Sequence, residues 1–415
     1  MKINKLFLLL ILSAPLFFNS CVKDKCEREI TYVKTTTVFK TYDEIRSGIS
    51  MEAPRDLVKP GKIYYYNNHL FINEQREGVH VFDNSFPENP VNLGFLKIPG
   101  NIDISIREGV LYADNYTDLL AISLSDISNP AILKRVEDVF PPLYIATEGI
   151  AVYYEYEEVT EVVDCNTEER RFSDDLFSGG FESTAADQSG NSGQGGSLAR
   201  FTIYDDYLYT IDNSDLHVFD INQIENPSEV NRVSVGWEIE TIFSYTDKLF
   251  IGSTTGMIVM DAADPANPTY LSQYSHFYGC DPVFVKAPYA YVTLRSGNNF
   301  CADNGNQLDL VNISDLNAIY LEKSFAMDNP HGLSIKDNTL FICEGDAGLK
   351  TFDIETPLDL NKNQLAHIKN IHAFDVISLP GSDDLLLLIG EDGFYQYNAQ
   401  DPTNLRLLSH IPVFK

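Results

Sequence analysis

The chain has 415 residues, of which 44% are hydrophobic and 12% aromatic, so it can bury a substantial core and is not a disordered chain. Its 60 acidic residues outnumber its 30 basic residues and give a formal net charge of −30. This balance argues against nucleic acid as a partner, because such binding depends on cationic contacts to phosphate. It favours solubility, attraction of cations or a basic partner.

Residues 1–20 have the pattern of a signal peptide. Lys2 and Lys5 precede the apolar run LFLLLILSAPLFF (6–18), which is shorter than a typical transmembrane helix. The sequence FNSC (18–21) resembles a bacterial lipobox, with Phe18 where leucine is usual. That resemblance implies that Cys21 becomes the lipidated N-terminus. We therefore expect residues 21–50 to form an anchor and tether, and the mature protein to be anchored to a membrane rather than embedded in it.

A repeat of about 40 residues runs through the rest of the chain. Its clearest copies are GVHVFD (78–83), DLHVFD (215–220) and GMIVMD (256–261), each followed by a turn that ends in Asn-Pro. A pair of strand signals precedes each copy and a fourth strand signal follows it. Four short strands per unit, without a convincing amphipathic helix, predict an all-β propeller of four-stranded antiparallel blades over residues 51–415.

The spacing of the units leaves two blade counts open. Leu143 lies one period after Asp103, and TEVVD (160–164) stands where HVFD stands in other units, so eight blades with a degenerate third are favoured. In that third unit the fourth strand is replaced by an insertion at 166–198, which ends in QSGNSGQGGS, a flexible linker composition. Seven blades with an elaboration is the alternative.

The HVFD, VVD and TFDI cores with their DPxNP-like turns resemble the LVIVD-repeat family of exported bacterial β-propellers. Together with the lipobox, they resemble its Bacteroidetes-type lipoproteins, over about residues 50 to 415. The resemblance implies a propeller and an envelope location, and it brings no catalytic residues. The sequence VKDK after Cys21 lacks the acidic run associated with surface export in such bacteria. We expect an outer-membrane anchor facing the periplasm, with surface exposure as the alternative.

The polar residue that ends each motif strand is predicted to be structural. Asp, Asn and Ser side chains accept hydrogen bonds from the backbone amide two residues on and so close a turn. A catalytic or metal-binding role would not survive exchange between these residue types. The positions are Asp83, Ser123, Asp220, Asp261, Asn312, Asp353 and Asn398.

Charged residues gather where the first strand of each unit begins and the second ends. Antiparallel pairing brings these two positions together at one mouth of the central channel. We expect the pairs Lys62–Glu74, Arg200–Asp212, Asp281–Arg295, His331–Glu344 and His372–Glu391, with Asp103–Asp114 like-charged, Glu240 facing Ser253, and Leu143 facing Tyr154 in the degraded unit.

A ring of such pairs is either structural or a ligand site. In the second interpretation the candidate binding residues are Asp103, Asp114, Glu240, Asp281, Arg295, His331, Glu344, His372 and Glu391. The sequence contains no zinc-enzyme motif and no DxDxDG calcium loop, so no cofactor is expected, although calcium on clustered carboxylates stays open. Cys280 and Cys301 flank the first two strands of their unit on the same side, where a disulfide is geometrically plausible.

Two functions follow from these features. The favoured one is a non-enzymatic, lipid-anchored binding or scaffold module for a protein or glycan partner. The alternative is a hydrolase or lyase that acts on glycans at the channel mouth through His331, His372 and nearby carboxylates. The enzyme requires these groups to converge on an open cavity, whereas the scaffold allows a plugged channel.

Overall fold

The computed structural model describes residues 27–164, 194–276, 282–295, 305–379 and 384–414. These divide into two units, residues 27–36 with 154–164 and residues 37–153 with 194–414, and each is described by itself. The predicted all-β class is confirmed. Across the described ranges the strands are accompanied by one short α-helix, α2 (Tyr42–Arg46), and one 3-10 helix, η2 (Pro357–Lys362).

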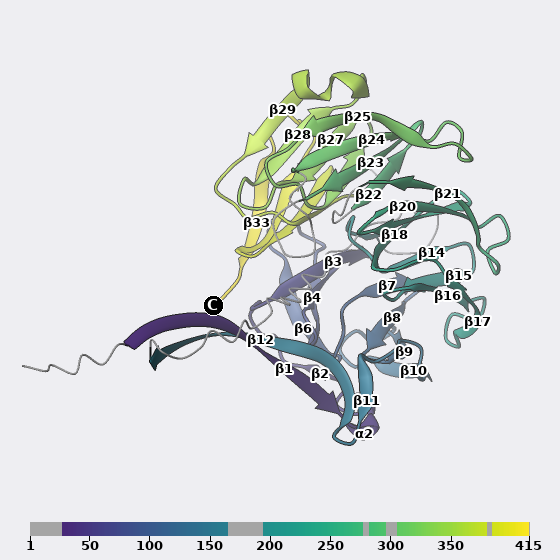
Figure 1. Cartoon of the computed structure of the whole chain (residues 1–415), viewed down its shortest axis with the longest axis vertical. Coiled ribbons are helices and arrows are strands. Elements are labelled where there is room, and N and C mark those ends of the chain that lie inside the picture. Colours follow the sequence, from purple (N-terminus) through teal and green to yellow (C-terminus); the bar gives the residue numbers. More distant parts are fainter. Residues whose placement is uncertain (1–26, 165–193, 277–281, 296–304, 380–383, 415) are drawn as a thin grey trace, which may run out of the picture. The chain divides into compact units, whose positions relative to one another are not determined.

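The larger unit is a propeller of four-stranded antiparallel blades (Figure 1). Blades 1 to 3 are β3 (Pro60–Tyr66), β4 (His69–Glu74), β5 (Gly78–Asp83) and β6 (Val91–Lys97); β7 (Ile104–Arg107), β8 (Val110–Asn115), β9 (Asp118–Ser123) and β10 (Ala131–Val136); and β14 (Phe201–Tyr204), β15 (Tyr207–Ile211), β16 (Asp215–Asp220) and β17 (Ser228–Ser234).

The same strand order continues through the rest of the chain. Blades 4 to 7 are β18 (Ile239–Tyr245), β19 (Lys248–Ser253), β20 (Gly256–Asp261) and β21 (Thr269–Ser275); β22 (Val283–Lys286), β23 (Tyr289–Leu294), β24 (Gln307–Asn312) and β25 (Tyr320–Ala326); β26 (Leu333–Lys336), β27 (Thr339–Cys343), β28 (Leu349–Asp353) and β29 (Gln364–Ile368); and β30 (Asp375–Ser378), β31 (Leu385–Gly390), β32 (Gly393–Asn398) and β33 (Arg406–Pro412).

The favoured count of eight blades is wrong, and the described residues form seven. The inner strands follow one another around the ring in the order β3, β7, β14, β18, β22, β26 and β30, and β3 packs against β31 of the last blade. Strand β7 contacts β14 directly, so no blade stands between the second and third units of this ring. The degenerate unit that begins near Leu143 is therefore not a blade of this ring.

That degenerate unit forms a different sheet. Its strands β11 (Tyr144–Ala146) and β12 (Gly149–Asp164) join β1 (Glu27–Lys40) in the order β1-β12-β11. In the smaller unit Thr31 Oγ1 lies 2.9 Å from Thr160 Oγ1, and Lys34 Nζ lies 3.9 Å from the Glu157 carboxylate, so β1 and β12 run antiparallel. TEVVD is thus part of β12 rather than a blade motif, and part of the expected tether is a strand.

The ring closes where the two ends of the propeller meet. Strand β2 (Ser50–Glu52) pairs with β6 at the outer edge of blade 1. Leu57 forms a parallel bridge with Val413, and the Phe414 amide donates to the Leu57 carbonyl at 2.9 Å. Because Leu57 is also buried between blades 1 and 7, this contact fastens the two ends of the ring to each other.

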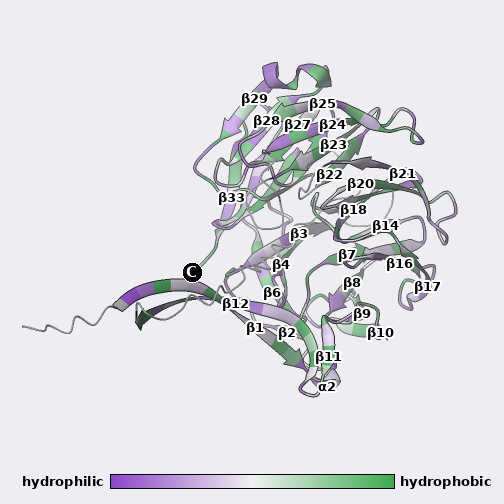
Figure 2. Ribbon diagram, in the orientation of Figure 1, coloured by the Kyte–Doolittle hydropathy of each residue, from purple (hydrophilic) through white to green (hydrophobic). Residues whose placement is uncertain are grey.

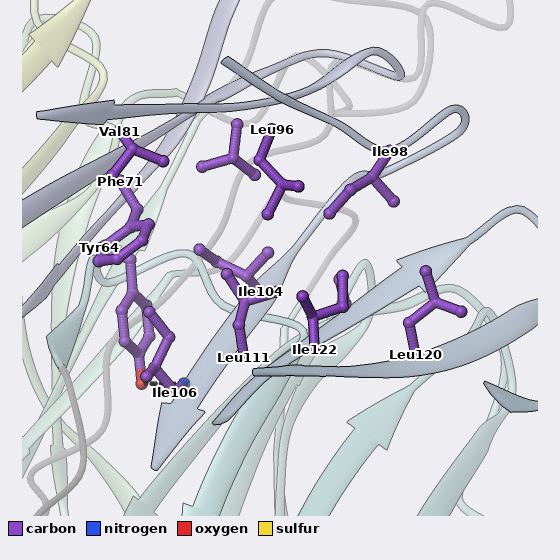
Figure 3. Packing of buried hydrophobic residues seen from close by; sticks show 12 residues of the cluster. Tyr64, Phe71, Val81, Leu96, Ile98, Ile104, Ile106, Leu111, Leu120 and Ile122 are labelled. Atoms are coloured by element: carbon purple, nitrogen blue, oxygen red, sulfur yellow. Dashed lines mark hydrogen bonds between the residues drawn. The ribbon is translucent and has the colours of Figure 1, made fainter. Parts of the chain in front are cut away.

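Apolar side chains between neighbouring blades make the core. Figure 2 shows apolar stretches along the blade strands, as expected for strands that are covered on both faces. Between blades 1 and 2, Tyr64 and Phe71 pack against Ile104 and Ile106 (Figure 3). The Ile106 amide donates to the Tyr64 hydroxyl at 3.1 Å, so a buried polar group is satisfied across the blade boundary.

The predicted turn closure is confirmed in every motif copy. Each side chain accepts a hydrogen bond from the amide two residues on, at 2.8 to 3.2 Å, at Asp83, Ser123, Asp220, Asp261, Asn312, Asp353 and Asn398. Asn and Ser do this as well as Asp, which explains why the motif tolerates all three.

Candidate functional site

Residues 194–199 fill the central channel of the propeller. Strand β13 (Gln194–Gly195) pairs with the inner strand β3 along its free edge, and the residues from Gly195 to Ala199 are all buried. The Ser197 amide donates to Asp375 of blade 7 at 3.1 Å, and its hydroxyl accepts from the Leu333 amide of blade 6. Residues predicted to end a flexible insertion therefore form a plug that contacts several blades.

Asp103 organises the charges beside this plug. Its carboxylate lies 3.0 Å from Lys62 Nζ and accepts from the backbone amides of Arg200, at 2.5 Å, and Phe201. Burial lowers the pKa of Lys62, and the charge of Asp103 opposes that shift. Lys62 thus pairs with Asp103 of the next blade, and the predicted Lys62–Glu74 pair is wrong.

The expected contact between Asp103 and Asp114 is confirmed, although Asp114 binds the backbone. Asp114 Oδ1 accepts from the Asp103 amide at 2.8 Å and from the Ile102 amide at 2.9 Å. Burial raises the pKa of Asp114 to about 6, amide hydrogen bonds oppose the rise, and the charge of Asp103 adds to it.

Asp375 is a buried carboxyl that the sequence reasoning missed. It is fully buried, and its Oδ1 accepts from the amides of Val376 and Ser197 at 2.9 and 3.1 Å. Burial raises its pKa to about 7 against these hydrogen bonds. Asp103 holds the Ile104 amide in the same way at 2.8 Å, so the sequence likeness of IDIS (102–105) to FDVI (374–377) was an available signal.

A second set of carboxylates is held by histidine or lysine side chains of the third strand of a blade. Glu74 lies 3.1 Å from His80 Nε2, and Glu344 lies 2.9 Å from Lys350 Nζ. Glu344 also accepts from the amides of Asp328 and Asn329 in the loop before its blade. The predicted His331–Glu344 pair is therefore wrong, because Lys350 and the loop amides hold this carboxylate.

Asp212 shows the same arrangement in blade 3. It lies 3.1 Å from His217 Nε2 and accepts from the amides of Ser214 and Asp215, each at 2.7 Å. Burial raises its pKa, but the hydrogen bonds from His217 and the two amides outweigh that effect and lower it to about 2. The predicted Arg200–Asp212 pair is also wrong. These partners could have been predicted, because His80, His217 and Lys350 all occupy the third position of the motif, in GVHVFD, DLHVFD and GLKTFD.

Two of the predicted site histidines lie together at the top face, which we define as the face where the first strand of each blade begins. The rings of His331 and His372 meet edge to face with centroids 6.2 Å apart. Arg295 Nη1 lies 3.1 Å from His331 Nε2, so blades 5, 6 and 7 contribute to one cluster. His331 is buried, whereas His372 is half-buried.

A pocket of 630 Å³ opens beside His372, and we call it the blade 6–7 pocket. It contains two of the predicted residues, His372 and Glu391, which are joined by a 3.2 Å hydrogen bond from the Glu391 amide to His372 Nδ1. The expected neighbourhood of these residues is confirmed, but through the backbone. The pocket is lined by Asp346, Asn370, Ile371, His372, Glu391, Asp392 and Val413.

The remaining predicted residues are Glu240 and those that the structure does not describe. Glu240 is half-buried in β18, beside Ile239, the residue that pairs with Ser253. Cys21, Asp281 and the proposed Cys280–Cys301 disulfide lie outside the described residues. The described part of the chain contains no group of three or more His, Cys, Asp or Glu side chains arranged to hold a metal. Among those residues there is also no helix long and apolar enough to cross a membrane.

Comparison with known proteins shows similarity at the level of the fold. No family model and no curated protein matches the chain. A solved protein from Lactobacillus plantarum is 11% identical with a TM-score of 0.52, and the match covers 85% of this chain and 96% of that chain. The computationally designed protein Ika8 is 9% identical with a TM-score of 0.50, and the match covers 89% and 94%. At such identities the likeness shows the fold alone.

Proposed function

We propose that this chain is a non-enzymatic binding module of the cell envelope, held at a membrane by lipid on Cys21, and that its partner docks on the top face at the blade 6–7 pocket. The LVIVD-type repeat and the lipobox-like FNSC sequence support the envelope assignment. The partner is a protein, with a glycan as the second possibility.

The plugged channel is the observation that carries this proposal. Residues 194–199 occupy the channel in which a ligand on the propeller axis would bind. Within this channel Ser197 forms hydrogen bonds to Leu333 of blade 6 and Asp375 of blade 7. A binding surface is then expected on a face of the disc rather than along its axis. The blade 6–7 pocket is a concave, mixed polar and apolar site on such a face, which is the usual form of a binding site.

The burial of Asp103 and Asp114 disfavours a glycan hydrolase or lyase that uses these two carboxyl groups. Such a reaction needs a general acid and a base within reach of a bound substrate. Asp103 and Asp114 are 3% and 8% exposed, and both carboxylates are bonded to backbone amides. Groups held in this way serve the fold and lie out of reach of a sugar chain.

Photo-crosslinking in intact envelopes tests the proposal. A photoreactive phenylalanine analogue replaces Asn370, an exposed residue of the blade 6–7 pocket, in the full-length protein. We expect a discrete adduct of higher mass that contains a specific partner.

The control carries the same analogue at Phe86, which is 75% exposed in the turn after β5. An exposed position outside the pocket should give no discrete adduct. If positions 370 and 86 give the same products, or neither gives any, the top face is not a docking surface and the proposed function is wrong.

A further inference from the structure

We infer that the blade 6–7 pocket recognises a lysine or arginine side chain of a partner protein. This inference rests on the proposed function and names the chemistry of its partner.

Asp392 supplies the unsatisfied acceptor. Its Oδ2 is engaged twice, by the His372 amide at 2.9 Å and by the Tyr395 hydroxyl at 3.0 Å. Its Oδ1 is shielded from solvent and accepts no hydrogen bond from any described residue. A carboxylate oxygen removed from water without a donor costs free energy. Because Oδ1 has almost no exposed surface, an N–H donor in the pocket reaches it when the Asp392 side chain shifts, and that contact would remove this cost.

His372 selects against a metal ion as the occupant. Its Nδ1 accepts the Glu391 amide hydrogen at 3.2 Å, which leaves Nε2 as the ring nitrogen that carries a proton. A protonated nitrogen has no lone pair for a metal, whereas it can donate to a carbonyl oxygen. A peptide whose charged side chain reaches the carboxylates can offer a backbone carbonyl to this Nε2–H.

The pocket carries negative charge that the fold does not compensate. Glu391 and Asp346 are exposed, and neither they nor Asp392 forms an ion pair with any described lysine or arginine. Nearby Glu344 and Asp328 differ, because Lys350 lies 2.9 and 2.7 Å from their carboxylates. A cation that enters the pocket therefore meets carboxylates that no described lysine or arginine neutralises.

The size and walls of the pocket match a long basic side chain. Its volume of 630 Å³ exceeds what one ion requires and leaves room for neighbouring peptide. Ile371 and Val413 form apolar walls, against which the methylene stem of lysine or arginine packs while its head remains in a polar environment. An amino sugar has the charge but lacks this stem.

Calorimetry with matched peptides tests the inference on the full-length protein in detergent. The probes are acetylated, amidated pentapeptides Gly-Ala-X-Ala-Gly in which X is arginine, lysine, citrulline or glutamate, together with a glucosamine trimer. Citrulline has the shape of arginine without its charge. We expect the arginine and lysine peptides to bind at least about tenfold more tightly than the citrulline peptide, and added salt to weaken them.

Two double variants locate the binding. Glu391→Gln/Asp392→Asn keeps the side-chain shapes and should abolish the preference for arginine over citrulline. Glu88→Gln/Glu225→Gln removes the same charge from exposed blade turns and should leave the preference intact. Native-like thermal unfolding of both variants shows that any loss of binding is not a loss of fold.

The inference is overturned if arginine and citrulline peptides bind alike, if no peptide binds, or if only the glucosamine trimer binds. These outcomes leave the proposed function standing when position 370 still crosslinks to a partner in envelopes. A failure of both experiments removes both claims.

Discussion

Two buried aspartates show how local contacts give one residue type opposite properties. Asp212 receives donors from a histidine and two amides, and its pKa falls to about 2. Asp375 is fully buried, its Oδ2 has no donor among the described residues, and its pKa rises to about 7. The first carboxylate stabilises the fold when charged, whereas the second is favoured when neutral.

Asp375 predicts a loss of stability with rising pH. Its folded pKa is above the usual value of 3.8, so the folded state binds the extra proton between about pH 4 and pH 7. Stability should therefore fall as pH rises through that window, by on the order of 4 kcal/mol at full ionisation. Facing Asp375 are Lys62, whose positive charge lowers this pKa, and Ser197.

Asp375→Asn removes the titrating group at nearly constant shape. The variant should lose less stability than the wild-type protein between pH 5 and pH 8, as measured by thermal unfolding at each pH. If stability fell equally steeply with pH in both proteins, Asp375 would be ionised throughout this range and its pKa would not be raised by burial.

At the scale of elements, the plug is the feature that joins the most distant parts of the ring. It adds a short strand to β3 of blade 1, and the Ile242 amide of blade 4 donates to the Ala199 carbonyl at 3.0 Å. Its glycines allow this close approach. A Cβ on Gly196 would lie 1.6 Å from Asp375 Oδ2 and 2.5 Å from Asp375 Cγ.

Gly196→Ala should destabilise the protein by about 1–3 kcal/mol or displace the plug, because overpacking in a closed site forces backbone shifts. Gly236→Ala is the matched control, since its Cβ would meet only Ile258 Cδ1 at 3.7 Å. Urea unfolding of both variants measures the difference. Indistinguishable midpoints for the two variants would contradict the account of the plug as a packed element.

The sequence predicted the elements that depend on local pattern. Alternating strands, the Asn-Pro turns and the turn-closing side chains such as Asp83 and Asn312 need only neighbouring residues, and all were found. Position 194–199 could not be predicted, because a glycine-rich linker and a closely packed plug have the same composition.

The site prediction assumed that the first strand begins at an equivalent position in every unit. His372 was aligned with Asp103, whereas the residue that performs the role of Asp103 in blade 7 is Asp375. The loops before the blades differ in length, so a fixed period misplaces the later columns. The partners of these carboxylates lie in the third strand of the same blade or in a neighbouring blade. Glu74, for example, is bonded by His80 of strand three. A prediction that pairs residues of strands one and two leaves such partners out.

At the scale of the whole molecule, the described residues form a ring of seven blades, and the degenerate unit is not one of them. The count was missed because β12 pairs with β1, a partner more than one hundred residues earlier in the chain. No local signal distinguishes a strand that pairs in its own blade from one that pairs at such a distance.

The predicted membrane location depends on lipid attached to Cys21. Cys21→Ala should abolish incorporation of labelled palmitate and move the protein from the membrane pellet to the soluble fraction, because the lipid would provide the anchor. A chromosomal wild-type copy is the control. Label or membrane association that persists in the variant would contradict the lipobox resemblance of FNSC.

The blade 6–7 pocket is the site at which we expect this propeller to meet its partner. The most direct measurement is crosslinking from position 370 in intact envelopes, compared between the otherwise unaltered protein, Glu391→Gln/Asp392→Asn and the control Glu88→Gln/Glu225→Gln. The account predicts that the partner adduct is lost in the first variant and retained in the control at equal protein levels. Absence of a discrete adduct from position 370 in the otherwise unaltered protein would contradict this docking site, whereas an adduct of unchanged yield in both variants would contradict the role of the two carboxylates.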